Sequence, residues 1–164
     1  MDLCEFNAYD LGIWSLVYRA SEDGFRAKNF HEKCDGIPNT LTIVKSTSGN
    51  VFGGYTERPW KLNEFFNNKN GFIFSLINKD GNPFRASCID ESSFCLSRHG
   101  PTFGNGKDLC LASRSNENEL SFSNFGSGYH HPSYEFGSNK AKTILAGSHR
   151  FRTIEIEVFY KKIE

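Results

Sequence analysis

The residues best placed for chemistry are a histidine and a cysteine three positions apart, His31 and Cys34. On one helix this spacing could let both side chains face a metal ion or form a thiol–imidazole pair. A zinc site needs four ligands, however, and no second Cys/His pair stands at zinc-finger spacing. Cys34 also falls at the C-terminal end of the predicted helix, where the negative end of the helix dipole disfavours a thiolate. We therefore expect Cys34 to be mainly structural and expect no metal site.

Carboxylates, a glycine-rich turn and two adjacent histidines are the other chemical candidates. Glu155 and Glu157 share one face of the predicted last strand, about 7 Å apart, and paired carboxylates can act as acid and base. The same alternation is typical of the solvent side of a half-buried strand with Lys or Arg on its neighbour, which we favour. Residues 104–107 (GNGK) lack the remainder of a phosphate-loop motif. His130 and His131 point apart on an extended chain, which argues against a shared metal ion.

Length, charge and cysteine content exclude several function classes. By length, residues 1–164 form a single domain. The 19 basic and 19 acidic residues balance to a formal charge of zero, which argues against nucleic-acid binding and membrane anchoring. The most apolar stretch, 11–18, is far shorter than the roughly 20 residues that span a membrane. The five cysteines lack framework spacing and no secretory leader is recognisable, so we expect a cytoplasmic protein, with a secreted disulfide protein as the alternative.

No nucleophile elbow, zinc-protease helix or dinucleotide fingerprint occurs in the sequence. We therefore expect no catalytic residue and no cofactor. We also expect a monomer.

Many short strands must position these candidate residues. The 16 phenylalanines and 15 glycines are typical of short strands joined by turns. A helix is predicted for 25–34, because Ala27, Phe30 and Cys34 share one face, and a weaker helical turn is predicted for 59–66. We expect a mainly β (α+β) fold, a sandwich of two antiparallel β-sheets flanked by one or two short helices. The predicted strands are 13–20, 40–45, 50–56, 72–77, 83–89, 94–98, 108–112, 120–123 and 150–160.

Three local patterns make sharper predictions. Gly53 and Gly54 would weaken a strand unless the backbone needs them, so we expect a bulge, a positive φ, or a bulky ring packed over the bare backbone. In the last strand the apolar side chains switch from one face of the strand to the other, which predicts a bulge near Thr153. In the first strand, alternation places three apolar side chains on one face: Trp14, Leu16 and Tyr18.

A Phe-Gly pair recurs in the chain, at residues 52–53, 103–104, 125–126 and 136–137. The simpler interpretation is an aromatic anchor beside a glycine that permits a tight turn. The functional interpretation is that several such loops gather into one recognition surface, on which a charge such as Gly128→Glu would leave the fold intact. The residues of these candidate interaction loops are Gly104, Gly106, Lys107, Gly126, Gly128 and Gly137.

An ordered set of motifs resembles the TLDc domain, the domain of the oxidation-resistance proteins. The match runs from about residue 13 to residue 160. It is carried by LVYRASEDGF (16–25), FHEKCDG (30–36), VFGGYTERPW (51–60), GPTFGNGKDL (100–109), SNFGSGY (123–129) and ILAGSHRFRTIEIEVF (144–159).

This resemblance implies a β-sandwich and a eukaryotic, intracellular role in protection against oxidative stress. Family members also bind the vacuolar proton-pumping ATPase, and the family has no established catalytic mechanism or cofactor. The resemblance thus implies a non-enzymatic interaction module, and the alternative is a thiol-based antioxidant enzyme with an exposed cysteine. The family-motif positions, mostly structural in character, are Arg19, Asp23, Gly24, Phe30, Cys34, Asp35, Gly36, Gly53, Gly54, Trp60, Gly126, Gly147, Glu155 and Glu157.

Overall fold

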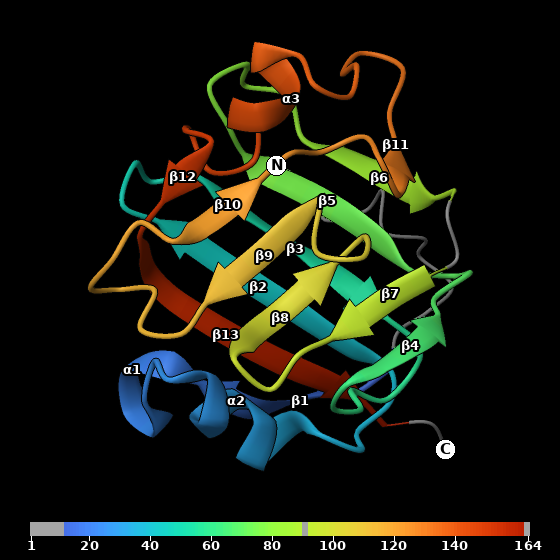
Figure 1. Ribbon diagram of the computed structural model, residues 1–164, viewed down its shortest axis with the longest axis vertical. Helices are drawn as coiled ribbons and strands as arrows, with labels where there is room; N and C mark the ends of the chain where they lie inside the picture. Colours follow the sequence, from blue (N-terminus) through green and yellow to red (C-terminus); the bar gives the residue numbers. More distant parts are fainter. Residues whose placement is uncertain (1–11, 90–91, 163–164) are drawn as a thin grey trace.

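Two antiparallel sheets face each other and enclose the core, which confirms the predicted sandwich (Figure 1). The computed structural model describes residues 12–89 and 92–162. The larger sheet has the order β1 (Trp14–Arg19), β13 (Thr153–Lys161), β2 (Thr40–Ser46), β3 (Val51–Thr56), β5 (Phe72–Ile77), β6 (Phe84–Cys88) and β11 (Tyr129–His130). The smaller sheet has the order β12 (Arg150–Phe151), β10 (Ser121–Ser123), β9 (Leu109–Ala112) and β8 (His99–Phe103).

A two-stranded ribbon and three short helices complete the fold. The ribbon pairs β4 (Glu64–Asn67) with β7 (Ser92–Cys95). Helices α1 (Ala20–Asp23) and α2 (Ala27–Cys34) lie at one end of the sandwich, and α3 (Asn139–Thr143) lies at the other (Figure 1).

The helical turn predicted for 59–66 is wrong. Asn63 adopts a positive φ of 57°, which a right-handed helix does not accommodate. The chain then continues into β4, whose backbone pairs with β7. The strand predicted for 94–98 is also misplaced, since β7 ends at Cys95 and β8 begins at His99.

A series of aromatic rings in edge-to-face contact fills the core from α2 to β11. Edge-to-face contacts join Tyr18 to Phe30 at 5.8 Å, Phe30 to Trp60 at 5.4 Å and Trp60 to Phe103 at 5.7 Å between ring centroids. Phe103 in turn contacts Tyr129 at 6.5 Å. All five rings are almost fully buried, and each burial stabilises the fold by roughly 1.5–3 kcal/mol.

The paired glycines of β3 serve close packing on both faces of the sheet. A Cβ on Gly54 would lie 2.5 Å from the ring of Phe103. A Cβ on Gly53 would overlap the carbonyl oxygen of Thr42 and lie 2.9 Å from the ring of Phe74. Neither glycine has a positive φ. The expectation of a ring packed over the bare backbone is therefore confirmed.

Two bulges adjust which side chains face the core. The register of β13 against β2 shifts between Thr153 and Glu155, which confirms the predicted bulge. A second shift, between Leu16 and Tyr18 in β1, was not predicted. It turns Tyr18 inward to 2% exposure and leaves Trp14 and Leu16 at 39% and 40%. The prediction that these three side chains share a face is therefore wrong, because the extra residue reverses the alternation.

Candidate functional site

Two of the predicted interaction loops meet around one buried carboxylate, Asp108, and the third packs against one of them. Its Oδ2 accepts hydrogen bonds from the backbone N–H groups of Gly126 at 2.9 Å, Ser127 at 3.1 Å and Tyr129 at 3.2 Å. Its Oδ1 accepts the N–H of Gly128 at 2.7 Å. The side chain of Asp108 therefore fixes the backbone of the turn before β11 to the start of β9.

The glycines of these loops allow the turns to approach one another closely. Gly104 adopts φ 75°, and a Cβ there would overlap the carboxylate of Asp108. A Cβ on Gly128 would lie 3.1 Å from the Cα of Gly104. A Cβ on Gly126, at φ 113°, would lie 3.1 Å from the backbone of Phe136. The loop after β8 thus contacts the turn before β11, and that turn contacts the loop before α3.

Close packing also corrects the expectation for Gly128. This glycine is buried, and a Cβ would lie 3.2 Å from Asp108 Oδ1 as well as against Gly104. A glutamate there would push a second carboxylate towards the first, so Gly128→Glu would disturb the loops rather than leave the fold intact.

The exposed part of this loop cluster is small and partly apolar. Phe103 and Phe125 are buried anchors, but the ring of Phe136 is 49% exposed, so only two of the three predicted anchors are buried. Lys107 and Gly137 are also exposed, and Gly106 is half-buried. The cluster therefore exposes an aromatic ring and a cation on loops that pack against a turn whose backbone is fixed by hydrogen bonds to the buried Asp108.

Burial dominates the electrostatics of Asp108. Removal from water raises the pKa of this carboxyl group to about 6, although the four N–H donors act in the opposite direction. No sequence motif singles out Asp108. The sequence shows only an acidic residue between a glycine-rich turn and a buried strand. This pattern does not reveal hydrogen-bond partners that lie 18–21 residues further along the chain.

The thiols and the candidate histidine do not form a reactive pair. His31 Nδ1 lies 2.8 Å from Asp35 Oδ1, and its Nε2 lies 2.7 Å from the carbonyl oxygen of His99. Cys34 is fully buried, and burial raises the pKa of its thiol far above the ordinary value. Burial raises the pKa of Cys95 to about 12.

The remaining cysteines differ in burial. Cys110 is buried, but Cys88 is only half-buried, contrary to the expectation of a buried side chain. Cys4 lies outside the described residues. Among residues 12–89 and 92–162, no three His, Cys, Asp or Glu side chains come together in a group that could hold a metal ion.

The charged family-motif positions attach α1 to the sheet. Arg19 Nε donates to Glu157 Oε1 at 2.8 Å, and its backbone N–H donates to Asp23 Oδ2 at 2.9 Å. Glu155 accepts the backbone N–H of Ser21 at 3.0 Å. Each of these carboxylates is therefore occupied by a structural partner.

Cross-strand neighbours complete this arrangement. Glu155 pairs across the sheet with Lys45, and Glu157 pairs with Arg19 on the other side. A basic residue thus lies opposite each glutamate.

The other family-motif positions lie in turns and in the core. Gly36 adopts φ 80° after α2, and its N–H donates to the carbonyl oxygen of Trp60. Gly24 ends α1 at φ 108°, and Gly147, at φ 92°, packs against Ser48. The indole N–H of Trp60 donates to Thr40 Oγ1 at 3.0 Å. These positions maintain backbone geometry and packing, separately from the loop cluster.

Comparison with known protein families gives one match, to the TLDc domain, over residues 2–162. The match extends beyond the expected limits of 13 and 160 at both ends. No curated protein matches the chain. No helix in the described part of the chain is long and apolar enough to cross a membrane. With essentially the whole chain matched, the protein belongs to the TLDc domain family and is an oxidation-resistance-type domain.

Proposed function

We propose that this domain is a non-enzymatic interaction module that binds and regulates the vacuolar proton-pumping ATPase. In this proposal it acts as a monomer in the cytoplasm of a eukaryotic cell, without cofactor, nucleic acid or insertion into a membrane. The observation that carries the proposal is the packing of three loops into one cluster, in which Asp108 binds the turn before β11 and Phe136 lies against Gly126. A surface built on fixed backbone loses little conformational entropy when it binds a large partner.

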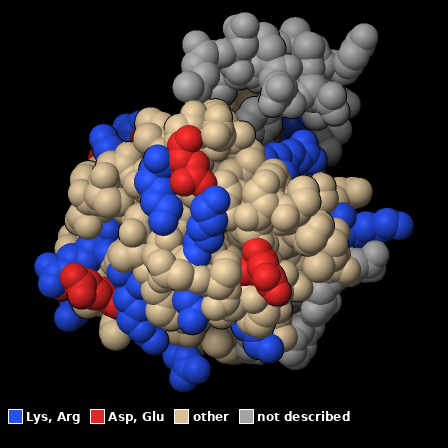
Figure 2. Space-filling view, turned by 90° about the horizontal axis from the view of Figure 1, so that it is seen from above, with Lys and Arg blue, Asp and Glu red and all other residues tan. Residues whose placement is uncertain are grey.

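The charge distribution favours binding through shape and a few anchors. The formal net charge is zero over the chain. On the end of the sandwich that carries α3, a few acidic side chains lie among more numerous basic ones (Figure 2). Long-range steering by a single-sign field is therefore weak. If a partner covers the exposed half of the Phe136 ring, about 100 Å² of apolar surface is buried, which contributes about 2.5 kcal/mol.

The burial of three of the four described thiols supports this proposal over a thiol-based antioxidant enzyme. A peroxide-reactive cysteine needs exposure and a lowered pKa. Burial instead raises the pKa of the thiols of Cys34, Cys95 and Cys110.

The test is association of the purified domain with the isolated pump, measured by co-sedimentation and by release of the soluble sector of the pump. Phe136→Asp and Lys107→Glu should weaken association at least about tenfold, since each changes an exposed side chain of the loop cluster. Leu120→Asp is the matched control, because Leu120 is 62% exposed and lies outside that cluster.

Unchanged thermal unfolding should accompany all three variants. Absence of association at micromolar concentrations, together with steady peroxide consumption by the domain alone, would refute the proposal in favour of the enzyme.

A further inference from the structure

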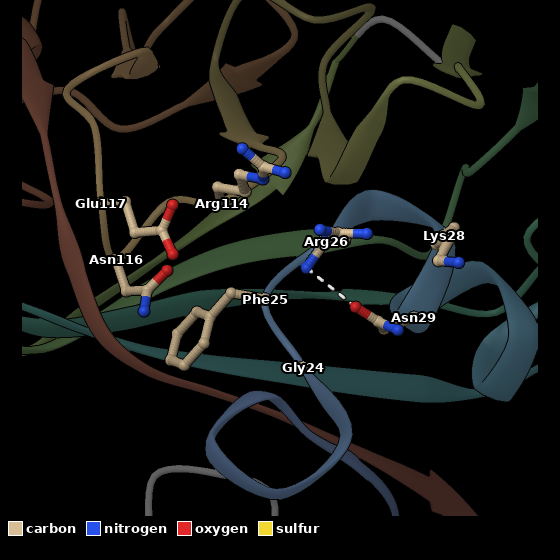
Figure 3. A pocket seen from close by; sticks show the side chains of 8 residues that line it. All are labelled: Gly24, Phe25, Arg26, Lys28, Asn29, Arg114, Asn116 and Glu117. Carbon is tan, nitrogen blue, oxygen red and sulfur yellow. Dashed lines mark hydrogen bonds between the residues drawn. The ribbon is translucent and has the colours of Figure 1, made fainter.

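A basic pocket of about 590 Å³ lies between the start of α2 and the turn that follows β9 (Figure 3). Arg26 and Lys28 come from the α2 side, and Arg114, Asn116 and Glu117 come from the turn. The pocket lies at the opposite end of β9 from Asp108, and the four residues of that strand span about 13 Å at about 3.3 Å per residue. It is therefore separate from the loop cluster.

Backbone contacts hold the two walls of the pocket together. The N–H of Arg114 donates to the carbonyl oxygen of Phe25 at 2.8 Å, and the N–H of Ala27 donates to Ser113 Oγ at 3.0 Å. Arg114 adopts a positive φ of 57°, and its carbonyl oxygen accepts the N–H of Glu117 at 2.9 Å. The pocket is thus formed before any ligand arrives, so binding costs little ordering of the backbone.

The positive charge of the pocket is uncompensated within the described part of the chain. Arg26, Lys28 and Arg114 are exposed and form no ion pair with another described residue. By contrast, Lys33 on the same helix pairs with Asp23 at 3.4 Å. The three cations face one carboxylate among the lining residues, so the pocket carries an excess of two positive charges.

This charge comes from side chains rather than from the start of the helix. The N–H of Arg26 is already bonded to Asn29 Oδ1 at 3.0 Å (Figure 3), and the N–H of Ala27 is taken by Ser113. An anion would therefore bind to the guanidinium and ammonium groups.

The other lining groups distinguish between anionic ligands. Guanidinium groups bind carboxylates and phosphates alike in a two-pronged geometry, so they do not by themselves select between these ligands. The amide of Asn116 can donate and accept, as a peptide backbone requires, and the half-buried ring of Phe25 offers apolar contact. Glu117 repels a compact ligand of high charge such as phosphate, whereas a peptide can place its carboxylates away from Glu117.

We propose that this pocket binds an acidic, extended segment of a partner protein, with its carboxylates on Arg26, Lys28 and Arg114. The site does not depend on the identity of the partner that binds the loop cluster. Its test uses neither the pump nor those loops, so either proposal can fail alone.

The experiment measures fluorescence anisotropy of a fluorescein-labelled octapeptide in which glutamate alternates with alanine. We expect saturable, salt-sensitive binding that the double variant Arg26→Gln/Arg114→Gln weakens at least about tenfold. The control is Arg58→Gln/Lys69→Gln, which removes the same charge from two exposed residues outside the pocket. The control should retain the wild-type affinity. Equal losses in both double variants would show a response to overall charge and overturn the proposal.

A second variant and a map of the bound surface complete the test. Glu117→Gln should tighten binding, because it removes the one carboxylate that lines the pocket. Amide NMR shifts on peptide addition should centre on 25–29 and 113–117. Shifts centred on 104–107 and 126–128 would overturn the assignment. Stronger binding of inorganic phosphate, or of vesicles containing phosphatidylserine, at equal ionic strength would also overturn the assignment of a peptide.

Discussion

Replacing Asp108 by asparagine separates two opposing effects on this buried carboxyl group. Four backbone N–H donors favour the ionised form of Asp108, whereas burial disfavours it. Burial is the larger effect and raises the pKa to about 6. In the unfolded chain the pKa returns to its ordinary value of 3.8. The folded protein therefore binds a proton at Asp108 more tightly than the unfolded chain does.

The sign of the pH dependence follows from this difference. Because the pKa is raised on folding, the stabilisation linked to Asp108 is fully present below pH 4 and is lost as the pH rises through about 6. The difference between the two pKa values corresponds to about 3 kcal/mol, at about 1.4 kcal/mol per pKa unit. Asp108→Asn lacks this titration.

The assay is urea unfolding of wild type and Asp108→Asn between pH 4 and pH 7. The free energy of unfolding of the wild type, minus that of the variant, should rise by up to about 3 kcal/mol as the pH falls from 7 to 4. Other titrating groups occur in both proteins and cancel in the difference. If this difference in the free energy of unfolding decreases as the pH is lowered, the four hydrogen bonds outweigh burial and the reasoning is refuted. Carbon-13 NMR titration of the carboxyl group provides an independent value.

Two further predictions concern the core. Cys34→Ala should lower the free energy of unfolding by about 1 kcal/mol. Thiol labelling of the native protein should modify Cys34 more slowly than the half-buried Cys88, and faster labelling of Cys34 would contradict its structural role. Gly54→Ala should cost about 1–3 kcal/mol in urea unfolding, because the ring of Phe103 occupies the space of the new methyl group. Gly100→Ala is the control, since its Cβ would come no closer than 3.4 Å to any atom beyond its chain neighbours, and an equal loss there would show that the Phe103 contact is not the cause.

Local patterns in the sequence predict several of the elements and some details within them, but they miss α3, β4 and β8. Runs of β-branched and aromatic residues locate β2 and β3, and the i, i+3, i+7 spacing locates α2. The change of parity in the last strand predicted the bulge near Thr153. Such features depend on neighbours along the chain, because the side-chain direction of a strand or helix repeats every 2 or 3.6 residues.

The tertiary structure alone decided which distant groups meet. The bulge in β1 buries Tyr18 and exposes Leu16, because the pairing with β13 rather than the alternation in β1 sets the register. Asp108 collects N–H donors from a turn that follows two strands later, and Arg26 meets a turn 88 residues away. Periodicity along the chain carries no information about such contacts. They arise from strand order and close packing, and this is why the loop cluster and the basic pocket emerged only from the fold.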